Sequence, residues 1–145
     1  MTSVVKLVSY DLPALATLYE ELTGRPTDLE AMRANHREME SNQDYILLGV
    51  KTENGDLVGS ALGIVCRDII DQCKPWMVVE NVIVAGHARG QGVGKLLMNA
   101  LEDIARSRGC SYINLTSSIK RPDAHHFYEA IGYADNLVKA FRKNL

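Results

Sequence analysis

The stretch GHARGQGVGKLL, from Gly86 to Leu97, constrains the fold of this chain more than any other. It places four glycines within nine residues, follows the apolar run WMVVENVIVA, and leads directly into good helix formers. Glycine in quantity weakens helices and strands, because it removes side-chain contacts and loosens the unfolded chain. The stretch therefore predicts a glycine-rich turn between a buried strand and an amphipathic helix.

Strand and helix patterns account for most of the remaining chain. Asp11 and Pro13 suit the first turn of a helix, and the Asn54-Gly55 pair between two strand patterns predicts a hairpin. The run WMVVENVIVA is apolar at nearly every position, which predicts a strand buried on both faces. The expected strands are residues 3–10, 45–52, 57–67, 76–85, 110–117 and 137–144, and the expected helices are 11–22, 28–41, 96–109 and 122–132.

This order of elements predicts an α/β protein with a central mixed, mostly antiparallel sheet flanked by about four helices. A length of 145 residues suits one domain with a sizeable core. The sequence has no internal repeat, low-complexity tract or linker, so residues 1–145 are expected to form a single domain.

Composition limits the function classes. The chain is 46% hydrophobic and 23% charged with a net charge of −2, which points to neither a nucleic-acid partner nor an anionic membrane. No secretory signal is visible at the N-terminus and no apolar run is long enough for a bilayer span. The three cysteines lack metal-ligand spacing. We therefore expect a cytoplasmic protein with reduced thiols and no required metal.

A turn between a strand and a helix N-terminus is a place where backbone N–H groups and the helix dipole favour an anion. A P-loop would need Gly at Arg89 and Ser or Thr at Leu96, and a dinucleotide fingerprint from Gly90 would need Gly at Lys95, so both fail. The pattern that fits is Arg-x-x-Gly-x-Gly, formed by Arg89, Gly92 and Gly94.

That pattern, after a strand reading VVENVIV, resembles the signature of the GNAT superfamily of N-acetyltransferases. The segment AHHFYEAIGY is similar to the Ala-x-x-Phe-Tyr-x-x-x-Gly-Tyr segment of the same family, and the order of elements matches the GNAT fold. The specific motifs cover about Val78 to Tyr133, and the first half of the chain agrees in pattern only.

The resemblance implies acetyl-CoA binding. The pyrophosphate would lie on the backbone amides at the helix N-terminus, where side chains would block a diphosphate, and the pantetheine arm would run beside the preceding strand. The implied cofactor-binding residues are Val82, Ile83, Val84, Arg89, Gly90, Gln91, Gly92, Val93, Gly94 and Lys95. A glycine-rich turn without a ligand is the alternative reading.

Acetyl transfer to an amine requires removal of a proton, polarisation of the thioester carbonyl and protonation of the leaving thiolate. Glu80 lies on the strand where the family often places its general base, although it could instead pair with a nearby Lys or Arg. Tyr128 corresponds to the family tyrosine that acts as general acid, and core packing is its alternative role. A backbone N–H near Val82 would polarise the carbonyl.

One position departs from the family pattern: Arg121 stands where an Asn is common. The surrounding segment is similar to aminoalkylphosphonate N-acetyltransferases, in which an Arg could meet an anionic group on CoA or substrate. A surface salt bridge is the alternative role of Arg121, and the usual Asn–pantetheine contact is in doubt.

The sequence thus predicts an acetyl-CoA-dependent N-acetyltransferase that acts directly on a primary amine of a small molecule. An aminoglycoside, a polyamine or a protein N-terminus as acceptor, and a non-catalytic acetyl-CoA-binding module, stay open as alternatives. The acceptor pocket is expected to draw on the first two helices and on the loop around Asp68–Lys74. Homodimer formation is left open.

Overall fold

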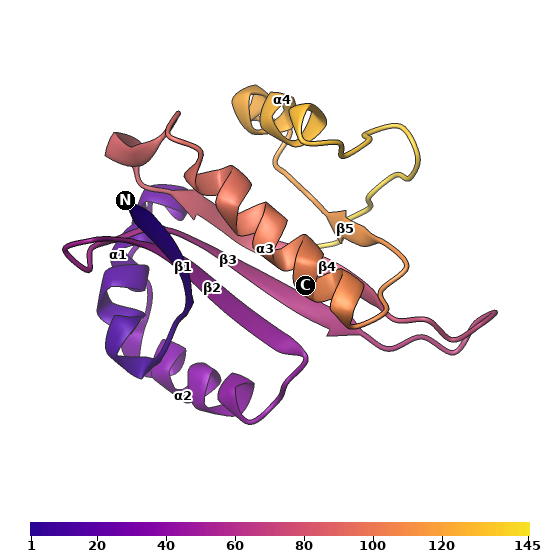
Figure 1. Cartoon of the computed structure of the whole chain (residues 1–145), viewed down its shortest axis with the longest axis horizontal. Coiled ribbons are helices and arrows are strands. Elements are labelled where there is room, and N and C mark those ends of the chain that lie inside the picture. The colour runs from indigo at the N-terminus through magenta and orange to yellow at the C-terminus, as the bar shows by residue number, and fades with distance from the viewer. The chain divides into compact units, whose positions relative to one another are not determined.

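Five strands form one sheet in the order β1-β2-β3-β4-β5 (Figure 1). The computed structural model describes residues Met1–Leu145, which form two compact units, Met1–Asn114 and Leu115–Leu145. Strands β1 to β4 pair antiparallel with their neighbours. The strands are β1 (Thr2–Lys6), β2 (Tyr45–Thr52), β3 (Leu57–Cys66), β4 (Trp76–Val84) and β5 (Ile113–Leu115).

In the first unit, helices cover both faces of this sheet (Figure 1). The helices of the chain are α1 (Leu12–Thr23), α2 (Leu29–Glu40), α3 (Val93–Ser107) and α4 (Pro122–Ala130), with short 3₁₀ turns η1 (Ser9–Asp11) and η2 (Gly86–Ala88). The predicted fold class is confirmed.

Alternation along β3 shows which helix covers which face. Leu62 packs with Leu12 and Leu15 of α1. Gly59, which lies on the other face, borders α3, and a Cβ there would come within 2.6 Å of Val93 Cγ1. Consequently α1 and α2 lie over one face, and α3 packs closely on the other.

The starts and ends of α1 and α2 follow the local signals. Pro13 occupies the first turn of α1, which ends at Gly24 in the left-handed region with φ 71°. Asp28 caps α2, since its Oδ1 accepts a 3.0 Å hydrogen bond from the Ala31 N–H. The helical spacing predicted both helices to within about two residues, although the expected cap Asp11 makes no side-chain hydrogen bond to α1 and accepts the Val8 N–H instead.

Two expectations are wrong. β4 is not buried on both faces, because Met77, Val79 and Ile83 are buried whereas Glu80 and Asn81 are exposed. Residues 137–144 form no strand. Leu137 is 80% exposed, so the apolar pattern of this segment gains neither a neighbouring strand nor a packed face, and it is these that make a strand stable.

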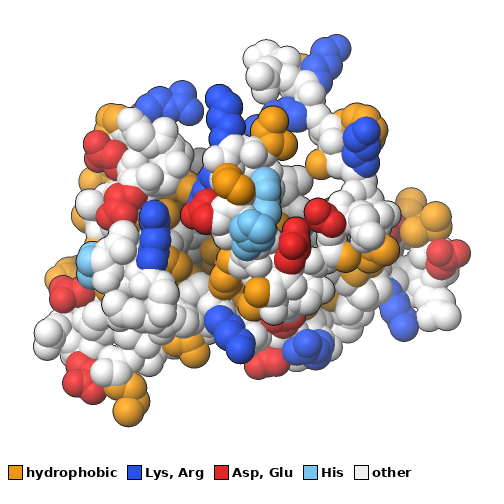
Figure 2. Space-filling view, turned by 90° about the horizontal axis from the view of Figure 1, so that it is seen from above, with side chains coloured by type: hydrophobic (Ala, Val, Ile, Leu, Met, Phe, Trp, Pro, Cys, Tyr) orange, Lys and Arg blue, Asp and Glu red, His pale blue; other side chains and the backbone are white.

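No helix in the structure combines the length and the apolar character needed to cross a membrane. On the face drawn in Figure 2, acidic and basic side chains are interspersed.

Candidate active site

A β-bulge interrupts the pairing of β3 with β4. Ser60 pairs with Ile83 and Leu62 pairs with Glu80, so Ala61 alone stands opposite both Asn81 and Val82. Asn81 has φ 55°, a left-handed conformation unusual for a residue within a strand. A bulge disrupts the ladder locally and redirects side chains, and bulges often lie beside active sites.

The bulge explains the exposure of Glu80. The residue pairs with Leu62, and paired residues of antiparallel strands point to the same face, so Glu80 leaves the sheet on the α1–α2 side. Because Glu80 is exposed, its charge carries no burial cost that an ionic partner would have to offset. Its interest lies in its position next to a pocket.

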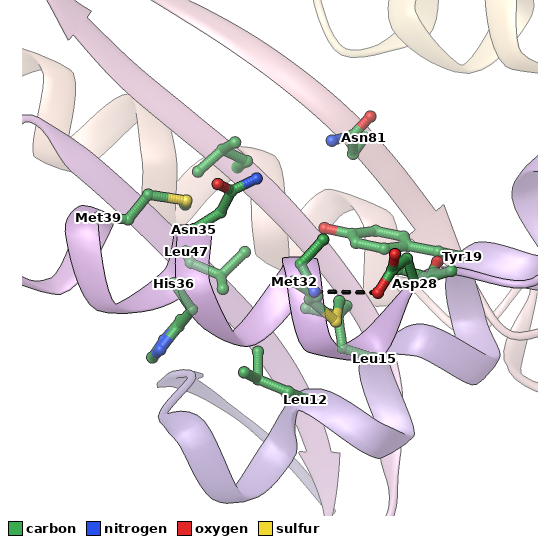
Figure 3. A pocket seen from close by; sticks show the side chains of 13 residues that line it. Leu12, Leu15, Tyr19, Asp28, Met32, Asn35, His36, Met39, Leu47 and Asn81 are labelled. Carbon is green, nitrogen blue, oxygen red and sulfur yellow. Dashed lines mark hydrogen bonds between the residues drawn. The ribbon is translucent and has the colours of Figure 1, made fainter.

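That pocket has a volume of about 340 Å³ and lies between α1, α2 and strands β2 to β4 (Figure 3). Most of its wall is apolar and comes from Leu12, Leu15, Met32, Met39, Leu47 and Leu62. The first two helices do contribute, as the sequence analysis predicted, whereas no residue of 68–74 lines the pocket.

Ala31 and six polar side chains complete the lining, the polar ones being Tyr19, Thr27, Asp28, Asn35, His36 and Asn81. Figure 3 places Tyr19, Asp28 and Asn81 toward one end of the pocket, and His36 and Met39 toward the other. His36 is buried and its Nδ1 lies 3.8 Å from Glu40 Oε2. The pocket therefore has polar side chains at both ends and leucine and methionine side chains between them.

Tyr19 lies toward the end of the pocket that holds Asn81. Burial raises the pKa of Tyr19, and a hydrogen bond with the Ser60 side chain opposes the rise only in part. Ser60 Oγ donates its own proton to the Leu48 carbonyl oxygen at 2.8 Å, so the protonated phenol of Tyr19 is the donor in its hydrogen bond with Ser60, and its oxygen stays available as an acceptor.

The glycine-rich turn follows β4 and leads into α3. Gly90 and Gly92 have φ 74° and 81°, a region that side chains other than Asn and Asp rarely adopt. Gly92 caps α3 without a side-chain hydrogen bond, and the first N–H bonded back to it is that of Leu96. The N–H groups of residues 93–95 are therefore available to an anion at the helix N-terminus.

Side chains hold this turn from its flanks. Arg89 Nε donates to the Val84 carbonyl oxygen at 3.3 Å, and Gln91 Nε2 donates to the His87 carbonyl oxygen at 3.1 Å. Glu21 of α1 accepts a 3.1 Å hydrogen bond from the Gly86 N–H. The backbone amides, rather than these side chains, thus form the open surface of the turn.

The other two predicted site residues belong to the second unit and are described within it. Tyr128 is half-buried on α4, with its ring edge-to-face with Phe127 at 5.2 Å and with Tyr133 at 6.1 Å. Arg121 is the residue before Pro122 and caps α4 without a side-chain hydrogen bond.

Sequence reasoning missed Tyr19 and Asn81 as pocket residues. Tyr19 lies four residues after Leu15, so both are on one face of α1, and this spacing predicts core packing for Tyr19. In the structure, that face of α1 lines the pocket. Asn81 did carry a signal, because two adjacent polar residues, Glu80 and Asn81, interrupt an otherwise apolar strand. Such a pair breaks strand alternation and is typical of a bulge.

Comparison with solved structures assigns this architecture to the acetyltransferases. An acetyltransferase from Trypanosoma brucei superimposes with a TM-score of 0.85 over 100% of both chains at 27% identity. The family model for the acetyltransferase (GNAT) family matches residues 12–133. The chain therefore belongs to the GNAT family of N-acetyltransferases, and the resemblance found in its motifs is confirmed.

Two relatives illustrate the range of the family. Glucosamine 6-phosphate N-acetyltransferase 1 from Oryza sativa subsp. japonica is 29% identical over 116 residues, which are 79% of this chain and 68% of that enzyme. Aminoalkylphosphonate N-acetyltransferase from Salmonella typhimurium is 38% identical over 55 residues, 38% of this chain and 36% of that enzyme.

Proposed function

We propose that this chain is an acetyl-CoA-dependent N-acetyltransferase that transfers the acetyl group directly to a primary amine of a small molecule. The observation that carries the proposal is the pairing of two features in one unit: a glycine turn with open amides at the start of α3, and a pocket at the β4 bulge. The first suits a diphosphate and the second a small acceptor.

Acetyl-CoA would lie along β4 and the turn. The amides of residues 89–95 would hold the pyrophosphate, and the backbone of Val82, Ile83 and Val84 would pair with the pantetheine arm as an added strand would. Arg121 would pair with an anionic group of CoA. The support is chemical: amides at a helix N-terminus hold anions without charged side chains.

The reaction needs one bond made and one broken. The amine nitrogen attacks the thioester carbonyl carbon, the new C–N bond forms, and the C–S bond breaks. In this proposal, Glu80 or a water that it holds accepts the amine proton, and the Tyr128 hydroxyl protonates the leaving thiolate. The Val82 N–H at the bulge stabilises the carbonyl oxygen as negative charge develops there.

The acceptor class is part of the same proposal. A compact amine is favoured over an aminoglycoside or a protein N-terminus because the pocket volume of about 340 Å³ is at the small end for ligand sites, whereas volume does not disfavour a polyamine. We also propose a cytoplasmic location, since all three cysteines are free thiols. A single domain over residues 1–145 remains our proposal for the chain.

The test is a transfer assay with the purified chain, acetyl-CoA and a panel of primary amines, read out as free thiol release and as acetylated product. Thiol release that depends on both substrates is expected. Binding of acetyl-CoA in a calorimeter without product from any amine would instead support a non-catalytic binding module. Absence of acetyl-CoA binding would overturn the proposal altogether.

A further inference from the structure

We propose that the acceptor amine carries an uncharged, largely apolar body, and that the pocket discriminates against amines bearing a phosphate or phosphonate group. The inference rests on the proposed function, because it takes the pocket at the β4 bulge as the acceptor site. It sets this chain apart from the two relatives above, whose names specify a phosphorylated or phosphonate-bearing amine.

The pocket lining lacks the cationic side chains that bind phosphate groups. None of its 13 lining residues is Lys or Arg, and the one lining carboxylate is Asp28. A phosphate group buried here would lose its hydration without gaining a cation or a fork of charged donors. The wall offers such a group repulsion from Asp28, one histidine, His36, which lies 3.8 Å from the Glu40 carboxylate, and otherwise uncharged side chains.

The N-terminus of α2, which lies at the pocket, would by itself favour an anionic acceptor. Asp28 caps this helix at the pocket, and a helix N-terminus carries roughly half a positive charge that attracts anions. The full negative charge of Asp28 exceeds this partial charge, and its Oδ1 already accepts the Ala31 N–H. The cap therefore turns an anion-attracting helix end into one that favours a cation.

The position of Asp28 also orients the acceptor. Figure 3 places Asp28 beside Tyr19, toward the end of the pocket that holds Asn81. An ammonium group held there lies next to the bulge, where Glu80 leaves the same face of the sheet. The remainder of the acceptor then extends toward Met39 and Leu47, whose apolar side chains share that end of the pocket with Asn35 and His36.

The affinity for the apolar part of an acceptor would depend on how much apolar surface it buries in the pocket, and not on specific hydrogen bonds. Each methylene group buried against the leucine and methionine wall is worth about fourfold in affinity or kcat/KM. A homologous series of alkylamines should consequently gain about fourfold per added carbon until the pocket is full. A phosphonate in place of the terminal methyl should reverse that gain.

The experiment compares hexylamine with 5-aminopentylphosphonate, which differ only in the terminal group, and glucosamine with glucosamine 6-phosphate. We expect kcat/KM to be at least about tenfold higher for the uncharged member of each pair. Binding of each amine to the chain without acetyl-CoA, measured by calorimetry, should follow the same order. Binding needs no catalysis, so it tests the pocket independently of the proposed reaction.

A variant with an added positive charge makes the test sharper. Asn35 lines the pocket from α2 and is exposed, so Asn35→Lys should fold normally. It should shift the preference between hexylamine and its phosphonate counterpart toward the phosphonate by about tenfold, because a cation then faces the anionic group. Asn99→Lys makes the same change on the exposed side of α3, away from the pocket, and should leave the ratio unaltered.

Three outcomes separate the two proposals. If hexylamine binds but no amine is acetylated, the reaction is wrong and the pocket assignment stands. If the phosphonate or phosphate member of a pair binds or reacts better, the inference is overturned even though acetyl transfer holds. If neither amine of any pair binds or reacts, the inference is likewise overturned.

Discussion

Glu80 of β4 pairs with Leu62 of β3, so a carboxylate leaves the sheet beside an apolar pocket wall. If Glu80 or its water accepts the amine proton, Glu80→Gln should lower kcat by about tenfold or more and flatten the rising limb of the pH–rate profile. The measurement uses two amines of different pKa, because titration of the amine itself also produces such a limb.

Glu38→Gln, at an exposed position of α2 outside the pocket lining, controls for the loss of one negative charge. A limb that follows the amine identically in wild type and Glu80→Gln would remove Glu80 from the mechanism. Positioning and desolvation of the free amine would then be the main contributions.

The turn before α3 predicts a charge effect at Gly92. Acetyl-CoA should bind wild type in the range of roughly 1 µM to 1 mM. Gly92→Asp should weaken that binding about tenfold or more relative to Gly92→Asn, because the two side chains have the same shape and differ by one negative charge. Both tolerate the left-handed φ of 81°, and no atom lies within 4 Å of a Cβ there. Equal affinities of the two folded variants in a calorimeter would show that the diphosphate lies elsewhere.

Removing one hydroxyl group tests the general acid. Tyr128→Phe keeps the ring that packs against Phe127 and Tyr133, so the fold and acetyl-CoA binding should persist. Turnover should fall by about tenfold or more if the hydroxyl protonates the thiolate. Tyr112→Phe, which alters a ring stacked on Trp76 in the first unit, is the matched control. Full activity of Tyr128→Phe would assign the residue to packing alone.

Acid should destabilise the chain through Asp11, which is 6% exposed and accepts a 2.6 Å hydrogen bond from Lys51 Nζ. Burial tends to raise the pKa of Asp11, but the bonds from Lys51 and the Val8 N–H and the charge of Lys51 together lower it. The unfolded state therefore binds more protons, so this stabilisation is complete above the ordinary value of 3.8 and is lost as pH falls through the lowered pKa.

Asp11→Asn should accordingly lower the free energy of unfolding in urea at pH 7 by about 1–3 kcal/mol, since Lys51 loses its partner. The difference from wild type should shrink in strong acid. Asp103→Asn breaks the exposed pair with Arg106 and should cost about 0.5 kcal/mol or less. A constant difference between wild type and Asp11→Asn down to the lowest pH would contradict the assignment.

Local signals predicted the elements whose causes are local. Pro13 marked the start of α1, and Asn54-Gly55 marked the hairpin between β2 and β3. Residues 137–144 had the strand pattern but form no strand. A strand also needs a second strand to pair with, and the local sequence does not specify whether one is present. The bulge at Asn81 likewise depends on how β3 and β4 align.

In the candidate site, too, local features could be predicted from the sequence and features that depend on tertiary packing could not. The glycine turn could be predicted because its conformation depends on glycine itself. Glycines clustered between a strand and a helix are an uncommon pattern and therefore a specific signal. The pocket could not, because residues such as Leu15 and Met32 have the same helical spacing whether they fill a core or line a cavity. The roles of Glu80, Tyr128 and Arg121 stay predictions.

The close approach of α3 to β3 at Gly59 has an evolutionary consequence. A single methyl group at this buried position would press on Val93, the first residue of α3, and move the backbone amides at the start of that helix. Most core positions accept substitution by residues of similar size. No other amino acid is as small as glycine, so position 59 has no such substitute. The glycine turn is thus restricted by a residue of the neighbouring strand, and any lineage that keeps this turn is expected to keep glycine at position 59.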